Sequence, residues 1–460
     1  MNFKKSRPLL FCDASASDPC RGLDRVVLWR DGEPIKSRRL LAQAEGLARR
    51  LPGSTHVINC CEERQNFVVA LLAAMLCKQI TLLPNDRTER SIELLHQTYR
   101  SLYVASDSDV AFGGIESIRL DLATADDTEE TVKIPDLPEE LPAVIAFTSG
   151  TTGQPQANPK AFGLLAKTAE LIADRFSFWG PLSPNLVATV PPQHMYGLET
   201  TIALTLWGPA AVDCRRPFFP ADVADCLTSL PEPRVLITTP VHLRAILGSK
   251  AALPKLEMII SATAPLSTDL AQQAETRYET QVMEIFGFSE AGTIATRRTL
   301  AGSAWTMCDE LELREEGDST LVDAEHFAKP LKFNDKIEVI SPTCFRHLGR
   351  EADSINVAGK RASLAGLNSI LSEIPGVEDG VFHPISQDDE KQTIRLAAFI
   401  VAPQAQRDSI NAALKARIDS AFWPRQTFFI KSLPRSETGK LSHSALSVLL
   451  KNQQPKNQHD

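Results

Sequence analysis

Short apolar runs alternate along the chain with longer segments of helical periodicity. Residues 37–51 place their apolar side chains on one helical face, and residues 67–77 are apolar throughout, as in a buried helix. The predicted strands are residues 25–30, 55–61, 80–85, 101–107, 142–147, 186–191, 210–215, 234–240, 257–263 and 281–287. Strands that alternate with helices predict an α/β fold with mostly parallel sheets covered by helices.

The pattern changes in the last third of the chain. After about residue 300 the expected strands are shorter and separated by turns, which predicts a small β-rich subdomain. Beyond residue 354, apolar runs and a helix near 404–421 predict a small α+β domain. The acidic segment 121–141 reads as a surface connection, and the polar tail 452–460 is expected to be disordered.

Composition excludes several classes of protein. The chain has 460 residues, of which 43% are hydrophobic, enough for a large core and a second domain. The net charge of −8 argues against a nucleic-acid partner. The longest apolar run is half a membrane span, so no membrane span is expected. Nine cysteines without a metal-type Cys-x-x-Cys indicate reduced thiols, and we expect a cytoplasmic protein without a signal peptide.

The stretch TSGTTGQPQ (148–156) follows a buried strand and has no charged residue. Gly150 and Gly153 allow backbone N–H groups to turn inward, and hydroxyls add further donors. Those hydroxyls come from Thr148, Ser149, Thr151 and Thr152. A loop after a parallel strand lies at the edge of the sheet where ligands bind, and a helix is expected to follow near Phe162. These residues alone fit either a phosphate-binding loop or a solvated surface loop.

The stretch TSGTTGQP resembles the phosphate loop of the adenylate-forming superfamily, which includes acyl-CoA synthetases, peptide-synthetase adenylation domains and luciferase. Further motifs follow in the order of that family. They are PPQHMYGLE (191–199), SATAPLS (261–267), IFGFSEAG (285–292), Asp335 with GREAD (349–353), and PRSETGK (434–440). The family separates its ribose-binding Asp from its hinge Arg by fifteen residues, and here 350 − 335 = 15.

The resemblance implies a domain organisation with a moving part. It implies a large N-terminal domain over residues 1–349, a hinge over 350–354 centred on Asp353, and a small mobile C-terminal domain over 355–451. In the family the small domain rotates between two reaction steps. Residues 356–361 would then line a thiol tunnel after the rotation.

The resemblance also implies an activity and two cofactors, ATP and Mg²⁺. The expected reaction is activation of a small carboxylic acid as an acyl-adenylate, followed by transfer to a thiol of acyl carrier protein or CoA. The loop 148–153 would hold the β- and γ-phosphates, Glu290 would carry Mg²⁺, and Ser289 would bind the α-phosphate. Lys440 would bridge the substrate carboxylate and the phosphate during adenylation.

The nucleoside would lie against a second set of residues. Thr263, Ala264 and Pro265 would lie along adenine, and Phe286 and Gly287 would pack on it. Asp335 would accept both ribose hydroxyls, with help from Arg350. Without the resemblance, each of these charged residues would be read as a solvated surface group and Phe286 as a core residue.

His194 leaves two readings open. In relatives that take aromatic acids a His at this point often lies against the ring, so His194 is a candidate catalytic or pocket residue. A buried, hydrogen-bonded structural His is equally compatible with the sequence. Met195, Tyr196 and Gly197 are expected to shape the same wall.

The chain departs from the family pattern at several points. Gln156 stands where the phosphate loop has Lys, and Lys160 in the turn-like QANPK is a candidate replacement. His443 and Asn356 replace a usual Arg and a usual Lys. The TGQPQ loop resembles the ligases of aryl-polyene and xanthomonadin-type pigments, which suggests a hydroxybenzoate-like acid. The alternatives are a fatty or medium-chain acyl-CoA synthetase, a weakly catalytic nucleotide-binding regulator, or an enzyme of amide formation or luminescence. The acid, the thiol acceptor and the oligomeric state stay open.

Overall fold

The computed structural model describes most of the chain. The described residues are 5–11, 22–84, 87–109, 112–120, 122, 133–149, 155–180, 183–317, 319–333, 335–350, 354–357, 360–387, 393–403, 406–436, 439, 441 and 443–453. Gly150–Gly153, Asp353 and Lys440, which the sequence singles out, lie outside these residues.

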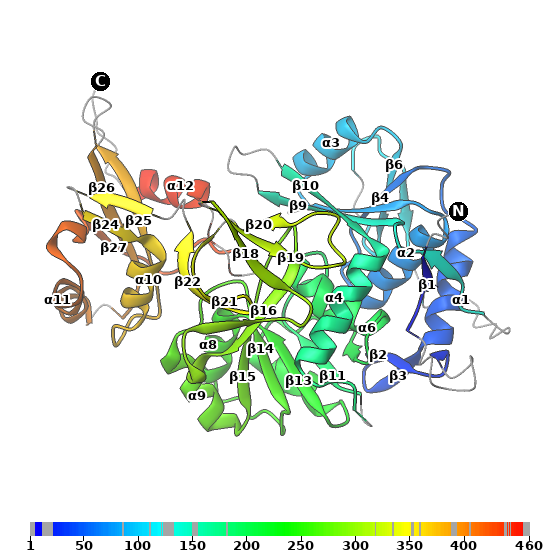
Figure 1. Ribbon diagram of the computed structural model, residues 1–460, viewed down its shortest axis with the longest axis horizontal. Helices are drawn as coiled ribbons and strands as arrows, with labels where there is room; N and C mark the ends of the chain where they lie inside the picture. The colour runs from blue at the N-terminus through cyan, green and yellow to red at the C-terminus, as the bar shows by residue number, and fades with distance from the viewer. Residues whose placement is uncertain are drawn as a thin grey trace.

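Among the described residues, six strands form a first sheet that is parallel except at one edge (Figure 1). In order across the sheet they are β10 (Pro155–Ala161), β9 (Pro142–Ser149), β5 (Ile80–Leu83), β4 (His56–Asn59), β6 (Leu102–Ser106) and β7 (Ser117–Arg119). The connecting helices are α1 (Ser37–Ala48), α2 (Arg64–Leu76) and α3 (Glu89–Thr98). The residues of α2 from Arg64 to Met75 are all buried, which explains why its sequence is apolar throughout from Phe67 onward.

A second sheet has eleven strands in the described part of the chain, and its central part is parallel. Its order is β21 (Asp335–Ser341), β22 (Cys344–Arg350), β17 (Ala304–Met307), β16 (Gly292–Arg298), β15 (Gln281–Phe288), β14 (Met258–Ser261), β13 (Arg234–Thr238), β11 (Asn185–Ala188), β12 (Ala211–Asp213), β2 (Val26–Arg30) and β3 (Glu33–Lys36). Its helices are α4 (Phe162–Arg175), α7 (Pro220–Thr228), α8 (Pro240–Gly248) and α9 (Thr268–Tyr278).

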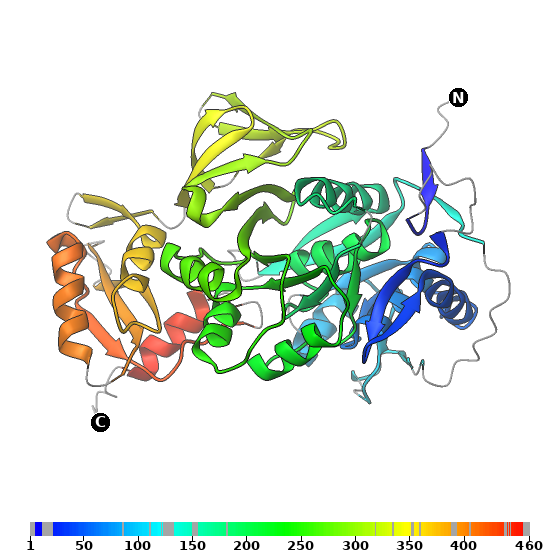
Figure 2. The same cartoon turned by 90° about the horizontal axis from the view of Figure 1, so that it is seen from below.

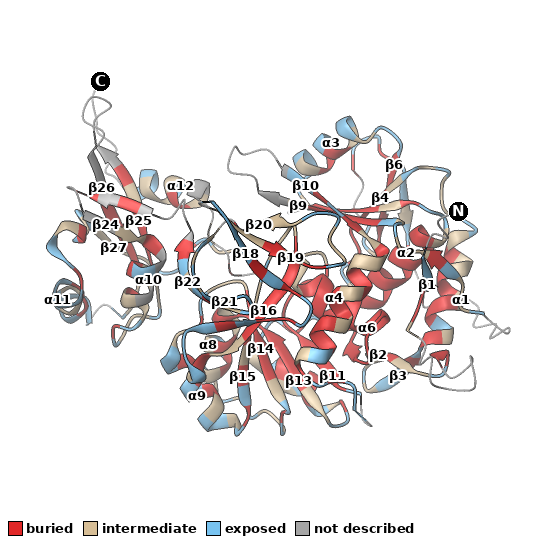
Figure 3. Cartoon of the chain, viewed as in Figure 1, coloured by how far each residue is buried: buried red, intermediate tan, exposed pale blue. Residues whose placement is uncertain are grey.

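The main core includes residues from both large sheets and their helices. Its buried side chains come from α1, α2 and α4, and from a helical segment made of α5 (Met195–Gly197), the π-helix η3 (Leu198–Ala203) and α6 (Leu204–Leu206). Figure 3 shows this buried interior in red along α2, α4 and α6. Phe162 at the start of α4 packs edge-on against Trp207, with ring centroids 5.4 Å apart. The core therefore fixes α4, which follows the phosphate-loop region, against the helical segment that follows His194.

A small β-rich part continues from the β21 edge of the second sheet and projects from it, as the yellow-green strands of Figure 2 show. It contains the antiparallel sheet of β18 (Glu312–Glu316), β19 (Ser319–Asp323) and β20 (Leu331–Lys332), next to the β21–β22 hairpin. Its core is aromatic, with Trp305, Phe333 and Phe345 buried. Elsewhere, β1 (Ser6–Pro8) pairs with β8 (Asp136–Pro138). A short 3₁₀ helix, η4 (Thr299–Ala301), follows β16.

The C-terminal part lies at one end of the molecule (Figure 1). Its elements are β23 (Ser354–Val357), β24 (Lys360–Ser363), α10 (Leu364–Ser372), β25 (Asp379–Gln387), β26 (Thr393–Val401), α11 (Arg407–Arg417), the 3₁₀ helix η7 (Ser420–Phe422), β27 (Gln426–Phe429) and α12 (His443–Gln453). Two hydrophobic clusters are built from C-terminal residues alone, around Leu371 and Phe399. This part of the chain thus has a core of its own.

The predicted alternation of strands and helices agrees with the observed elements. One local prediction is wrong: residues 156–160, read as a turn, form the strand β10, and α4 begins at Phe162 only after that strand. No helix among the described residues is both long and apolar enough to cross a membrane.

Candidate active site

Most of the singled-out motifs follow the carboxyl ends of strands. Parallel neighbours β11, β13, β14 and β15 end next to Pro191–His194, Thr239, Thr263 and Ser289, respectively. Because these strands are parallel, the segments after them gather at one edge of the sheet. The phosphate-loop region belongs to the other sheet, but Lys160 of β10 reaches the main chain of Glu290 after β15. The two sheets therefore bring their loops to one place.

The predicted phosphate loop connects β9 to β10, which pair antiparallel. Ser149 lies opposite Pro155 and Thr148 opposite Gln156; the side chains of Thr148 and Ser149 are not described. Gln156 is exposed, and its carbonyl accepts a hydrogen bond from Asn158 Nδ2 at 3.1 Å. Lys160 lies four residues further along an extended strand, so about 13 Å of chain separates it from Gln156. Lys160 is therefore not folded back onto the loop.

The turn that carries Ser289 and Glu290 connects β15 to β16. A Cβ added at Gly287 would lie 2.3 Å from the carbonyl oxygen of Gly292, so the two strands approach too closely for any side chain there. The Glu290 side chain is half-buried, and among the described residues no hydrogen-bond partner is found for its carboxylate. A carboxylate left available in this way fits Mg²⁺, which binds one or two carboxylates together with phosphate oxygens.

A cluster of acidic, His or Cys ligands able to hold a metal alone is absent from the described ranges. A metal at Glu290 would therefore complete its coordination with phosphate oxygens and water.

The strip predicted to lie along adenine follows β14. Thr263 has φ 78°, a left-handed conformation that is unusual for a β-branched residue and often marks a functional position. Ala264 is half-buried and Pro265 exposed. The strip is held by the buried carboxylate of Glu284, which accepts the N–H of Leu266 at 3.2 Å.

Glu284 was missed by the sequence reasoning. Its second oxygen accepts hydrogen bonds from Arg297 Nε at 2.6 Å and Thr299 Oγ1 at 2.8 Å. An acidic residue inside the apolar strand run QVMEIFG was the available signal.

Phe286 belongs to an aromatic cluster. Its ring is stacked with Phe333 at 5.7 Å and lies 5.4, 5.6 and 5.2 Å from the rings of Trp305, Phe345 and His347. The ring is half-buried, so contact with adenine stays a prediction.

Asp335 and Arg350 lie directly opposite each other in the β21–β22 hairpin. The fifteen-residue spacing seen in the sequence is therefore the length of a hairpin. The Arg350 side chain is not described. His347 Nε2 lies 2.9 Å from Asp335 Oδ2, and the same ring packs on Phe286. His347, which sequence reasoning missed, thus links the two expected nucleoside contacts.

The segment after β11 is tightly constrained. A Cβ at Gly197 would lie 2.0 Å from the carbonyl oxygen of Pro191, so only glycine fits there. Tyr196 Oη donates to the Ile260 carbonyl at 2.9 Å, and burial raises the pKa of Tyr196 well above its usual value. His194 is half-buried and stands at the N-cap position of α5. These contacts leave both readings of His194 open.

Two further side chains support the same edge. The fully buried Arg64 donates from Nη2 to the carbonyls of Ala188 and Val190, each at 2.9 Å, and so fixes the end of β11. His242 Nδ1 lies 3.0 Å from Thr189 Oγ1 and 3.1 Å from Thr239 Oγ1. Burial, and the charge of Arg216, lower the pKa of His242 below its usual value. A neutral imidazole therefore lies beside the ends of β11 and β13.

The loop of the predicted Lys440 approaches this edge from the small domain. Gly439 has φ 78°, and a Cβ there would lie 3.3 Å from Val241 Cγ2 and 3.8 Å from Thr239 Oγ1. Arg435 Nη1 donates to the Gly439 carbonyl at 2.7 Å, while its Nη2 and Nε bind Asp379 at 2.6 and 2.7 Å. The residue before Lys440 is thus held against the start of α8.

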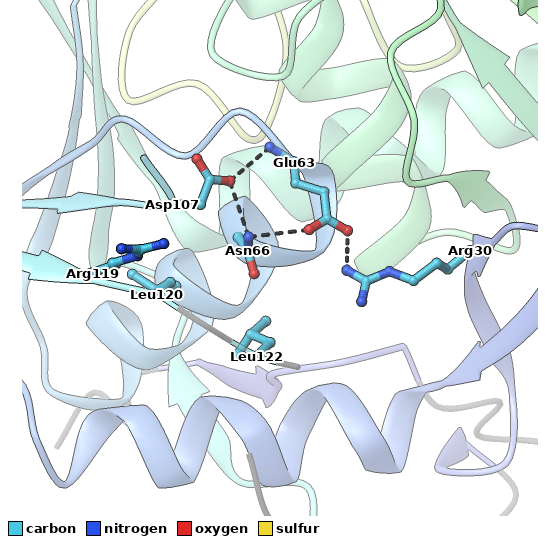
Figure 4. A pocket seen from close by; sticks show the side chains of 7 residues that line it. All are labelled: Arg30, Glu63, Asn66, Asp107, Arg119, Leu120 and Leu122. Carbon is cyan, nitrogen blue, oxygen red and sulfur yellow. Dashed lines mark hydrogen bonds and ion pairs between the residues drawn. The ribbon is translucent and has the colours of Figure 1, made fainter. Parts of the chain in front are cut away.

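A polar pocket of about 190 Å³ near the start of α2 is separate from the motifs (Figure 4). Its Asp107 accepts the N–H groups of Glu62 and Glu63 and the amide of Asn66, and Glu63 pairs with Arg30. These contacts hold the two residues before α2 and the first turn of the helix in place. We assign the pocket no part in the candidate site.

Comparison with known proteins identifies the family. The model of the AMP-binding enzyme family matches residues 22–318. The chain belongs to the AMP-binding enzyme family. A 4-coumarate–CoA ligase of Rhodobacter capsulatus is 28% identical over 65% of this chain and 75% of its own length. A 3-hydroxybenzoate–CoA/4-hydroxybenzoate–CoA ligase of Thauera aromatica is 24% identical over 70% of this chain and 68% of its own.

A solved structure shares the fold. It is the o-succinylbenzoate coenzyme A synthetase of Bacillus subtilis, in complex with ATP and magnesium ion, with a TM-score of 0.78 and 16% identity. The match covers 96% of this chain and 100% of that one. The predicted membership of the adenylate-forming superfamily and the predicted fold class are both confirmed.

Proposed function

We propose that this protein activates an aromatic, hydroxybenzoate-like carboxylic acid with ATP and transfers the acyl group to a thiol of CoA or acyl carrier protein. The observation that carries the proposal is the meeting of the Glu290 turn, the Thr263 strip and the Gly439 loop at the edge formed by β13, β14 and β15. The enzyme class, an AMP-forming acid–thiol ligase, is confirmed by the family match together with the CoA ligases among the relatives.

The first step joins the acid to AMP. A carboxylate oxygen attacks the α-phosphorus of ATP, the bond to the β-phosphate oxygen breaks, and pyrophosphate leaves. Because an anion attacks a polyanion here, the site has to align the reactants and supply positive potential. In this proposal the hairpin loop 148–153 holds the outer phosphates, Ser289 binds the α-phosphate, and Lys440 bridges phosphate and carboxylate.

Mg²⁺ fits the available carboxylate of Glu290 and would neutralise charge on the phosphate oxygens during this step. The nucleoside is proposed to lie between the Thr263–Pro265 strip and Gly287, with its ribose hydroxyls on Asp335. The His347 hydrogen bond would keep one oxygen of Asp335 oriented, which leaves the carboxylate ordered before ATP arrives.

The second step exchanges the leaving group. The thiol sulfur attacks the acyl carbon, the bond to the phosphate oxygen breaks, and AMP leaves. We propose that Asp353 is the hinge about which the small domain, residues 355–451, turns between the steps, so that Lys440 serves the first step only.

The proposed acid rests on two kinds of support. The first is the position of the His194–Gly197 segment after β11, since His242 lies by Thr189, just past the end of the same strand. We propose that the rings of His194, Tyr196 and His242 form one wall of the acid pocket. The second is the likeness to ligases whose names specify coumarate and hydroxybenzoate. Aromatic acids suit such a wall because ring edges and faces pack well against aromatic side chains.

Acid-dependent exchange of pyrophosphate into ATP tests the first step. We expect exchange with hydroxybenzoates or cinnamates above fatty acids, and strict dependence on added Mg²⁺. A thioester assay with CoA and with holo-acyl carrier protein then identifies the acceptor. Exchange with none of the benzoates, cinnamates and fatty acids would contradict the proposal.

A further inference from the structure

Two oppositely charged side chains are buried beneath the turn that carries Glu290. Lys160 is 2% exposed and Glu199 is 3% exposed. Charged groups are rarely buried so completely unless they are paired or hydrogen-bonded, since their transfer from water is costly. We call Lys160 and Glu199 the buried clamp, and residues 288–293 the carboxylate turn. The clamp is not used by any step described above.

Lys160 holds the start of the carboxylate turn. Its Nζ donates a hydrogen bond of 2.6 Å to the main-chain carbonyl of Glu290. Lys160 lies on β10, the strand that runs directly from the phosphate loop to α4. A bond to the main chain fixes the residue that bears the carboxylate while leaving the carboxylate itself available.

Glu199 holds the end of the same turn. Its Oε2 accepts hydrogen bonds from Thr293 N at 3.0 Å and from Thr293 Oγ1 at 2.6 Å. Its Oε1 lies so close to Gly292 that a Cβ on that glycine would be 2.4 Å away. Gly292 has φ 82°, so glycine is needed both for the backbone conformation and for the approach of the carboxylate.

The charges of the two clamp residues support each other. Burial lowers the pKa of Lys160 and raises the pKa of Glu199, which in both cases favours the neutral form. The negative charges of Glu199 and Glu290 raise the pKa of Lys160, and the positive charge of Lys160 lowers the pKa of Glu199, so both oppose the effect of burial. The hydrogen bonds from Thr293 also lower the pKa of Glu199 and favour its ionised form. Removing either partner therefore leaves a buried charge with less compensation: Lys160 would keep Glu290, and Glu199 would keep its bonds from Thr293.

Glu199 comes from a third motif. It lies in the π-helix η3, five residues after His194, and π-helical segments are frequent at functional sites. The clamp thus connects the phosphate hairpin, the helical segment after His194 and the carboxylate turn.

We propose that Lys160 and Glu199 are positioning residues that hold the carboxylate turn in place, so that Glu290 and Ser289 are presented to Mg·ATP. This rests on the proposed function. Lys160 then compensates for the missing lysine at Gln156 by ordering the carboxylate turn and not by reaching the outer phosphates.

The test measures nucleotide binding without turnover. Mg·ATP and AMP are titrated into the full-length protein with no acid present, by calorimetry, and the melting temperature is recorded for each variant. We expect Lys160→Met to weaken Mg·ATP binding at least tenfold and to weaken AMP binding by a clearly smaller factor. The reason is that AMP has no β- and γ-phosphates, so the Mg²⁺ proposed at Glu290 contributes little to its binding, and its contact with Ser289 is supplemented by the proposed nucleoside contacts of the Asp335 region. Lys160→Arg, which keeps charge and donor, is expected to recover part of the loss.

Further variants separate positioning from folding. Lys160→Met combined with Glu199→Gln removes both buried charges, so the melting temperature should recover while the weak Mg·ATP binding persists. Thr293→Val, which removes one bond to Glu199, should weaken Mg·ATP in the same direction and is available if Lys160→Met does not fold. Lys167→Met is the matched control, because Lys167 pairs with Glu310 on the surface and should change neither affinity.

Two results would overturn the proposal. The first is that Lys160→Met and Thr293→Val both bind Mg·ATP as tightly as the unmodified protein does. The other is an equal loss of AMP and Mg·ATP affinity, which would show a merely structural role. Failure of pyrophosphate exchange with every acid would instead contradict the proposed function, because binding of Mg·ATP needs no acid.

Discussion

Gly287 shows how a single residue controls the candidate site. A methyl group there would meet the Gly292 carbonyl at 2.3 Å and the Thr293 Cα at 3.0 Å, both of them backbone atoms of the facing strand. Because backbone cannot swing aside as a flexible side chain can, the strands would have to separate next to Ser289 and Glu290.

We therefore expect Gly287→Ala to lower the free energy of unfolding by about 1–3 kcal/mol, the usual cost of overpacking. Mg·ATP binding should fall with it, and urea unfolding with calorimetry measures both. Gly248→Ala is the control, since a Cβ there meets nothing within 4 Å. Equal stability of the Gly287 variant and the control would show that the strands yield without cost.

His242 predicts a pH dependence of stability. Its pKa in the folded protein is lowered from 6.5 by burial, and by the charge of Arg216. As the pH falls below 6.5, His242 becomes protonated in the unfolded chain while it is still neutral in the folded protein. The free energy of unfolding therefore decreases until the pH falls below the pKa of His242 in the folded protein. We expect unfolding free energy to fall faster with acid in the unmodified protein than in His242→Gln. Parallel pH profiles over pH 5–7 would contradict this.

Some residues of the candidate site were identified from the sequence, and others were seen only in the structure. The spacing of Asp335 and Arg350 was recognised from the resemblance to the family, and the hairpin that places the two opposite each other explains it. Glu284, His347 and Glu199 were not readable, because each acts through a partner 12 or more residues away that only folding brings close. The fold itself followed from apolar periodicity, which depends on local burial and not on such distant partners.

Among the elements, the β10 strand of the β9–β10 hairpin is the one that the sequence predicted wrongly, as a turn. Pro159 and Asn158 in QANPK favour turns, but pairing with the apolar strand β9 overrides that preference. Because β10 is extended, Gln156 lies near the tip and Lys160 lies deep between the sheets.

Restoring a lysine at the hairpin tip should strengthen phosphate binding. Gln156 is exposed, so Gln156→Lys should keep the fold and lower the apparent KM for ATP a few-fold, since exposed ion pairs contribute about 0.2–1 kcal/mol. Ala157→Lys adds the same charge one residue on, where the side chain points to the other face of the strand. An equal effect of the two variants would indicate general charge attraction and not a local contact.

The loop from Arg435 to Leu441 makes a second prediction at this scale. Arg435 joins Asp379 of β25 to the Gly439 carbonyl, and Arg435 and Leu441 form an isolated bridge. Hydrogen bonds to charged groups contribute about 1.5–3 kcal/mol, so Arg435→Met should slow adenylate formation roughly 10- to 100-fold.

The same variant should leave the second step unchanged. Thioester formation from synthetic acyl-adenylate and thiol is the measurement, because Lys440 is proposed to serve adenylation alone. Arg417→Ala, which removes a surface bond to the Glu373 carbonyl in the same domain, is the control. Equal slowing of both steps by Arg435→Met would show that the variant disturbs the small domain as a whole.

In the whole molecule, separate cores predict separate unfolding. The clusters around Leu371 and Phe399 contain C-terminal residues only, whereas the core shared by the two sheets contains none of them. Leu371→Ala should destabilise the small domain by about 2–5 kcal/mol. Calorimetry should show one transition moving to lower temperature while AMP binding is retained. A single transition that moves as a unit would mean that the domains unfold together.

The β21–β22 hairpin sets the interval between Asp335 and Arg350 through two irregularities that cancel. The numbers of opposed partners sum to 685 at Asp335–Arg350 and at Ser341–Cys344, but to 684 at the three pairs from Ile337 to Val339. Leu348 on one strand and Ile340 on the other are the residues passed over where the register shifts, one on each strand. An unmatched deletion at either place would leave the register displaced by one residue from there to the open end, so Asp335 would no longer face Arg350. The interval of fifteen residues therefore includes one extra residue from each strand.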